Sequence, residues 1–165
     1  MTSTTSRSPR PLPPAGLCLR PARVDDLAAV RPLLLASDLT DQGVEDFFGE
    51  AYAVAEQDGR IVGRIVGVAG IEVYSRWGLL RSVAVAAELR GCGLGEALVR
   101  DRLDWARGKA LSAVFLLTTA APLWYLRFGF TNLERSQVPP EVQASPEFSG
   151  LCPAHSVVMG LTLAP

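Results

Sequence analysis

The spacing of apolar positions in the first half of the chain predicts strands and helices in alternation. The acidic pair Asp25 and Asp26 suits the positive end of a helix that begins there, and Pro32 falls inside its apolar pattern. Because proline lacks a backbone donor, we expect it to kink that helix or to start a second one. Asp58 and Gly59 separate two apolar runs, which is a strong hairpin signal. The expected elements are a strand at 17–20, a helix from about 25, a short helix at 41–50, and strands at 51–57 and 60–74.

The second half of the chain continues this mixture, which makes the expected class α/β. A nearly continuous apolar run at 112–119 predicts a strand buried on both faces. Arg102 falls on the apolar side of an expected helix, so it must snorkel or find a partner. The expected elements are a strand at 77–86, a glycine-rich loop, a helix at 94–107, the strand at 112–119, a short helix at 122–127 that Gly129 ends, and a last strand at 156–163.

Length and composition predict one globular domain behind a short tail. The 165 residues are 48% hydrophobic, which is enough for a full core. Residues 1–16 are rich in Ser, Thr, Arg and Pro and have no apolar periodicity, so they predict a flexible or polyproline-like tail. The acid-free start also loosely resembles a transit peptide, although its prolines would spoil an amphipathic helix. The domain itself is expected at 17–165.

Charge and cysteine usage exclude several classes of partner. With 16 basic against 17 acidic residues, the chain lacks the broad positive field of a nucleic-acid or anionic-membrane protein. Cys18, Cys92 and Cys152 are odd in number and include no C-x-x-C pair, so neither a disulfide framework nor a zinc site is predicted. No apolar run approaches the roughly 18 to 20 residues that span a bilayer. We therefore expect a cytoplasmic protein without a metal or membrane partner.

A glycine-rich loop, "RGCGLGE" at 90–96, follows an apolar strand and precedes a helix. Free amides of the first helical turn and the helix dipole make such a loop an anion site. A Rossmann fingerprint needs G-x-G-x-x-G, and here Glu96 takes the place of the third glycine. A phosphate loop of the Walker type needs G-K-[ST], which the chain lacks. Both nucleotide readings are therefore weakened.

The same loop resembles the R-x-x-G-x-G pattern of the GCN5-related N-acetyltransferases, the GNAT family. Arg90, Gly93 and Gly95 carry that pattern. About thirty residues on, "LWYLRFGF" resembles a second family segment, in which a tyrosine lies four residues before the glycine of a G-F pair, and Tyr125 is that tyrosine. The resemblance implies a GNAT fold: a central mixed, mostly antiparallel sheet, splayed between the strands that flank the coenzyme site, with helices on both faces. It covers about 17–163.

The resemblance also assigns a donor site for acetyl-coenzyme A. The strand before the loop would pair its backbone with the pantetheine arm, and Tyr125 would be the general acid that protonates the departing thiolate. Loop amides would bind the pyrophosphate, with Arg90 also offering charge. The residues implied in coenzyme binding are Val83, Ala84, Val85, Arg90, Gly91, Cys92, Gly93, Leu94, Gly95 and Glu96.

The acceptor side is predicted from two charges on apolar strands. Glu72 is our candidate for the general base, with an ordered water as the alternative. Arg81 would be costly to bury without a partner, and a bidentate contact to an acceptor carboxylate would explain it. An ion pair between Arg81 and Glu72 is the competing explanation. Cys92, at a helix start, raises a covalent acyl-cysteine route, which we disfavour because the only histidine, His155, is distant in sequence.

A narrower resemblance is to an arsenic-resistance-associated N-acetyltransferase subfamily, carried by 78–99, 115–130 and 138–159, and more distantly to amino-acid N-acetyltransferases. It implies acetyl transfer to the amine of a small acceptor, an amino acid or an amino-acid-like organoarsenical, by direct attack in a ternary complex. A non-catalytic acetyl-coenzyme A sensor and a peptide or protein N-acetyltransferase are the alternatives. A homodimer is left open, because many members pair through C-terminal strands. The segment 144–156, with Glu147, Ser149 and Ser156, is a candidate lining of the acceptor pocket.

Overall fold

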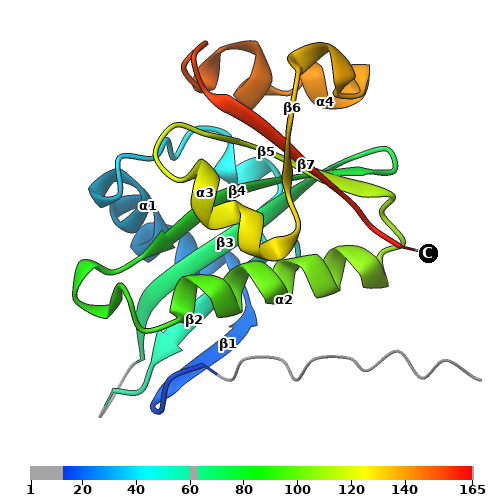
Figure 1. Ribbon diagram of the computed structural model, residues 1–165. Coiled ribbons are helices and arrows are strands. Elements are labelled where there is room, and N and C mark those ends of the chain that lie inside the picture. The colour runs from blue at the N-terminus through cyan, green and yellow to red at the C-terminus, as the bar shows by residue number, and fades with distance from the viewer. Residues whose placement is uncertain (1–12, 60–62, 165) are drawn as a thin grey trace, which may run out of the picture.

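The computed structural model describes residues 13–59 and 63–164, which form a seven-stranded sheet with helices on both faces (Figure 1). The strand order is β1-β2-β3-β4-β5-β7-β6. The β4–β5 pair is parallel and the other pairs are antiparallel, so the expected mixed, mostly antiparallel sheet is confirmed. The strands are β1 (Leu17–Pro21), β2 (Tyr52–Gln57), β3 (Arg64–Tyr74), β4 (Trp77–Val85), β5 (Ala113–Thr118), β6 (Thr131–Leu133) and β7 (Val157–Thr162). The α-helices are α1 (Leu27–Ala36), α2 (Leu94–Gly108), α3 (Pro122–Tyr125) and α4 (Pro140–Gln143).

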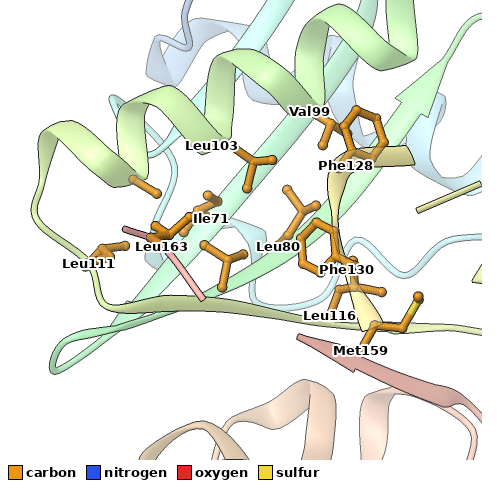
Figure 2. Close-up of a cluster of buried hydrophobic side chains, with 12 residues drawn as sticks. Ile71, Leu80, Val99, Leu103, Leu111, Leu116, Phe128, Phe130, Met159 and Leu163 are labelled. Atoms are coloured by element: carbon orange, nitrogen blue, oxygen red, sulfur yellow. The ribbon is translucent and has the colours of Figure 1, made fainter. Parts of the chain in front are cut away.

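Alternating side chains of the central strands bind the two long helices to opposite faces of the sheet. Ile71 of β3 packs with Val99 and Leu103 of α2 in a cluster that Phe128 and Phe130 complete (Figure 2). Residues three positions away along β3 point the other way, because successive strand side chains alternate between faces. Val68 accordingly packs with Val30 and Leu34 of α1. The helices α1 and α2 therefore lie on opposite sides of β3 and β4.

The C-terminal segment, residues 140–156 from α4 to the start of β7, covers the same face of the sheet as α1, but over the other half of that face. Leu79 of β4 and Phe115 of β5 pack against Val142 of α4 and Phe148, which belongs to a π-helical turn at Glu147–Leu151. Leu80, next to Leu79, packs on the α2 side. Helix α1 and the C-terminal segment therefore pack against the same face of the sheet. The space between them lies over β4 and β5.

Most of the predicted elements are confirmed, and the departures have local causes. A kink or a second helix was expected at Pro32; α1 runs as one helix through the proline, so the second of these alternatives was wrong. The short helix expected at 41–50 is confirmed only in part, as a 3₁₀ helix at Val44–Asp46 that follows Gly43 in the left-handed conformation. Strand β6, helix α4 and the turn at Glu147–Leu151 lacked a recognisable periodicity, since each has five residues or fewer.

The expectations for the hairpin at Asp58 and Gly59 and for Arg102 are confirmed at least in part. β2 and β3 pair antiparallel as expected, but the pairing closes at Gln57 and Arg64 rather than at Asp58 and Gly59, and residues 60–62 lie outside the described residues. Residues 1–12 of the predicted tail also lie outside them. Arg102 finds partners, donating to the Glu50 carbonyl oxygen at 2.7 Å and pairing with Asp101 at 2.8 Å. Within the described chain, no helix is long and apolar enough to cross a membrane.

Candidate active site

A wedge opens in the sheet where β4 and β5 diverge. The parallel pairing joins Trp77, Gly78 and Leu79 to Ala113–Phe115, after which β4 continues to Val85 beside β3, and β5 continues beside β7. A bulge sets Ser82 and Val83 of β4 against one residue of β3, with Ser82 at a φ of 58°. Beyond Leu79, the edge of β4 that faces β5 carries backbone groups free of strand pairing. Such an edge can pair with an extended ligand arm.

A groove of about 340 Å³ runs from this free edge of β4 to the start of α2. Gly91 and Gly93 hold φ values of 80° and 87°, which residues with a Cβ rarely adopt. Gly93 caps α2 without a side-chain hydrogen bond, so the amides of the first turn are available to an anion. The predicted coenzyme residues that line the groove are Val83, Ala84, Val85, Arg90, Gly91, Gly93, Gly95 and Glu96.

Two residues implied in coenzyme binding do not line this groove. Leu94 is 1% exposed and packs into the core with Leu98. Cys92 is exposed, and its thiol donates to the Leu89 carbonyl oxygen at 2.7 Å. At these two positions only the backbone amide is available for the predicted role.

Arg127 is a groove residue that the sequence reasoning missed. It lies 5.3 Å over the Trp124 ring and 3.5 Å from a Glu96 carboxylate oxygen, and with Arg90 it lines the groove. Its signal in the sequence was its place in "YLRFGF", two residues after Tyr125. Two guanidinium groups therefore border the loop, and guanidinium pairs well with phosphate oxygens.

Tyr125 lies where this groove meets a second cavity, because it lines both. Its ring is fixed by edge contacts with Trp124 at 4.9 Å and Phe130 at 6.0 Å between centroids. Gly129, with a φ of 94°, ends the turn that carries the tyrosine and leads into β6. Burial raises the pKa of Tyr125 to about 12. The phenol therefore keeps its proton at neutral pH, as a general acid must.

The second cavity has a volume of about 320 Å³ and lies between α1 and the C-terminal segment on one face of the sheet. Residues 37–40 after α1 form one wall, and residues of the C-terminal segment form the other wall. The floor consists of residues 80–83 of β4 and of 117–121, which include the end of β5 and the residues that follow it. From that segment come Glu147, Leu151, Cys152, Pro153 and Ser156, whereas Ser149 is exposed. The volume is at the small end of the range for small-molecule sites, roughly 300–1,000 Å³.

Arg81 is the centre of a buried charge cluster at this cavity. Its side chain is 2% exposed, and its Nη1 lies 3.1 Å from a Glu72 carboxylate oxygen. Its Nε lies 3.1 Å from Glu147 Oε1, and its Nη2 donates to the Gln42 carbonyl oxygen at 2.9 Å. The two Nη atoms therefore donate hydrogen bonds to protein oxygens, whereas Nε forms an ion pair with Glu147 without a hydrogen bond. The ion pair with Glu72, the competing explanation for Arg81 in the sequence, is present.

Glu72, our candidate base, has both carboxylate oxygens engaged. Oε1 accepts from the Tyr74 hydroxyl at 2.9 Å, and Oε2 accepts from Arg81. Burial raises the pKa of Glu72 against the opposing effect of Arg81. The residue is 2% exposed and is not among the residues that line the cavity of 320 Å³. The carboxylates that line it are Glu147 and, at the rim, the exposed Asp38.

The cysteines lie apart from one another. Cys18 and Cys92 are exposed, whereas the Cys152 thiol donates to Glu147 Oε2 at 2.9 Å. Burial and the neighbouring carboxylate raise the pKa of Cys152 to about 12, so its thiol stays neutral. Among residues 13–59 and 63–164, no three His, Cys, Asp or Glu side chains are grouped as metal ligands.

The fold and the groove define an acetyltransferase, and comparison with known families agrees. Residues 48–132 match the family described as acetyltransferase (GNAT) domain. The chain therefore belongs to the GNAT family. It is an N-acetyltransferase whose cosubstrate is acetyl-coenzyme A.

Individual relatives point to amino-acid acetyltransferases. One from Mycobacterium tuberculosis, named amino-acid acetyltransferase, is 31% identical over 150 residues, 84% of this chain and 79% of the relative. N-acetylglutamate synthase from Neisseria gonorrhoeae, solved with coenzyme A and N-acetyl-glutamate, superposes with a TM-score of 0.76 at 20% identity. That match covers 90% of this chain and 35% of the synthase chain. A M. tuberculosis protein solved with CoA and NLQ has a TM-score of 0.72 at 25% identity, covering 89% and 99%.

The raised pKa of Tyr125 predicts the alkaline side of the rate profile. Because this phenol ionises near 12 rather than near 10, its proton is retained over the range in which a free tyrosine begins to lose it. We expect kcat to stay level between about pH 8 and pH 10. A stopped assay of thiol release at saturating substrates would check this. A falling limb centred near pH 9 would contradict the assignment.

The left-handed conformation of Gly93 predicts a binding defect when a side chain is added. Gly93→Ala forces alanine to a φ of 87°, at a cost of about 1–2 kcal/mol. If the loop relaxes to relieve that strain, affinity for acetyl-coenzyme A falls roughly 5- to 30-fold. Gly108→Ala, at the other end of α2 and without a positive φ, is the matched control. Calorimetric titration with coenzyme A measures both, and equal affinities would show that the loop conformation is not required.

Proposed function

We propose that the protein transfers the acetyl group of acetyl-coenzyme A to the amine of a small acceptor, an amino acid or an amino-acid-like compound, within a ternary complex. The position of Tyr125 carries this proposal, because the tyrosine borders both the donor groove and the separate cavity of 320 Å³. A donor and an acceptor held in these two spaces meet at one phenol. The names of the relatives support an amino-acid acceptor.

The chemistry assigned to the chain's own residues is direct transfer. The free edge of β4 and the loop amides hold the donor so that its thioester lies beside Tyr125. The acceptor nitrogen attacks the thioester carbonyl carbon, a C–N bond forms, and the C–S bond breaks. Tyr125 gives its proton to the departing sulfur and recovers one from solvent. The proton that the amine releases goes to an ordered water or to Glu72, and Glu72 would need to exchange its present partners.

The charge cluster changes how Arg81 is expected to act. We predicted that it binds an acceptor carboxylate, and its place in the cavity lining supports that role. Its guanidinium already contacts Glu72, Glu147 and the Gln42 carbonyl, so a ligand carboxylate would have to displace one of them. The cluster therefore supports a structural role for Arg81 at least as well as a binding one.

The size of the cavity favours a small acceptor over the two alternatives. A walled cavity of about 320 Å³ has room for an amino acid, and a coenzyme sensor has no need of it. A thiol-release assay with amino acids, polyamines, peptides and amino-acid-like organoarsenicals tests the proposal. We expect turnover with one of the small amines. Coenzyme binding without thiol release across the panel would identify a sensor, and turnover of peptides alone would identify a peptide acetyltransferase.

A further inference from the structure

Glu147 is a second carboxylate beside Arg81, and it lines the cavity of 320 Å³ that we propose as the acceptor cavity. Arg81 already has Glu72 at 3.1 Å and a backbone carbonyl at 2.9 Å, which together make a buried ion pair with one further hydrogen bond. Glu147 adds a second carboxylate to the same guanidinium, with a side chain only 8% exposed. A buried carboxylate is costly unless its charge is balanced. With both carboxylates ionised, one guanidinium balances only one of them, and the cluster carries one negative charge.

Among the described residues, no cation other than Arg81 pairs with Glu147. Arg135, which acts to lower the pKa of Cys152, donates instead to the Phe148 carbonyl oxygen and lies over the Phe148 ring. The Cys152 thiol donates to Glu147 and stays neutral, because burial raises its pKa to about 12. Burial also raises the pKa of Tyr52 to about 12 and raises that of Tyr74, so both phenols stay neutral. Asp38, at the rim of the cavity, adds a further carboxylate. The only basic side chain among the residues that line the cavity is Arg81.

We propose that Glu147 binds the ammonium group of the acceptor, so that the cavity selects acceptors that carry one carboxylate or none over those that carry a second. The inference rests on the proposed function. An acceptor ammonium beside Glu147 would balance this charge, and a charge-assisted hydrogen bond would orient it. Before the nitrogen attacks the thioester, the ammonium gives one proton to an ordered water or to Glu72. A second acceptor carboxylate would meet Glu147 and Asp38 instead, and like charges placed together strongly disfavour a ligand. Acceptors such as glutamine are therefore favoured over glutamate.

The test compares acceptors that differ by one charge, in the full-length protein and its Glu147→Gln variant. For the wild type, we expect kcat/KM for glutamine to exceed that for glutamate by about tenfold or more, and asparagine to exceed aspartate likewise. In Glu147→Gln, we expect each ratio to fall to within about threefold of unity. For the acceptor with the highest kcat/KM in the panel, the variant should raise KM about tenfold or more without changing KM for acetyl-coenzyme A.

Two further variants separate charge from structure. Glu147→Asp keeps the charge on a shorter side chain and should retain most of the discrimination. Glu141→Gln removes an exposed carboxylate of α4 that does not line the cavity. It should leave the glutamine-to-glutamate and asparagine-to-aspartate ratios of kcat/KM unchanged. Thermal melts of each variant show whether the fold is kept, and Arg81 keeps Glu72 and the Gln42 carbonyl in all of them.

The possible outcomes separate the role proposed for Glu147 from the acetyl transfer proposed for the protein. Wild-type turnover of glutamate at least equal to that of glutamine, or unchanged ratios and KM in Glu147→Gln, would overturn the role of Glu147 and leave the acetyltransfer in place. A preference for glutamate would indicate that its carboxylate displaces Glu147 from Arg81. Absence of thiol release with every amine would overturn the proposed function, and the inference with it.

Discussion

Tyr125→Phe is expected to lower kcat by about 10²- to 10⁴-fold while leaving the affinity for acetyl-coenzyme A unchanged. The substitution removes one hydroxyl and keeps the ring contacts with Trp124 and Phe130 that hold the turn together. Without the phenolic proton, the sulfur leaves as a thiolate, which is a poorer leaving group. Steady-state thiol release gives kcat, and titration with coenzyme A gives the affinity.

Tyr74→Phe is the matched control for that experiment. Tyr74 is also a tyrosine whose pKa burial raises, but it bonds Glu72 and is not among the residues that line either cavity. Its loss should cost about 1 kcal/mol of stability and leave kcat within about a few fold of the wild type. Equal activity of Tyr125→Phe and the wild type would remove Tyr125 from the chemistry.

Arg81→Ala is expected to destabilise the fold by about 3–5 kcal/mol, because it leaves Glu72 and Glu147 buried without a partner charge. For a domain of this size, that loss lowers Tm by about 10 °C. Thermal unfolding followed by circular dichroism measures it. KM for the acceptor should be measured only below the thermal transition of the variant, because an unfolded fraction would not bind the acceptor.

A surface arginine on the neighbouring strand supplies the comparison for Arg81. Arg64 of β3 pairs with Glu88, and both side chains are more than half exposed. Arg64→Ala should therefore change stability by about 0–1 kcal/mol. Replacing Glu72, Arg81 and Glu147 together with Gln, Met and Gln should recover much of the loss, because no unpaired charge is then buried. A stable Arg81→Ala variant would show that the carboxylates are solvated or protonated in the fold.

The elements that the sequence predicted well are those with a long or strictly repeated pattern. The helix at 94–107 is within one residue of α2, and the strand at 112–119 contains β5. The stretch from 134 to 152 was not assigned, because α4 and the turn at Glu147–Leu151 are too short for periodicity to reveal. That unassigned stretch forms one wall of the acceptor cavity.

The sequence by itself determined the donor side of this protein. A loop whose glycines require positive φ, followed directly by a helix, specifies an anion site from adjacent residues alone. Tyr125 was predicted from the resemblance of its short segment to the family, and that segment ends in a left-handed glycine. These features depend on local backbone conformation, and local conformation is what neighbouring residues encode.

The acceptor side was decided only by the tertiary structure. Arg81 and Glu72 were singled out as charges on apolar strands, but whether they faced a ligand or each other depended on the register of β3 and β4. Glu147 reaches the same guanidinium only because the C-terminal segment packs over Leu79 and Phe115. The net charge of a cavity is a sum over side chains from distant parts of the chain, and folding alone brings them within range of one another.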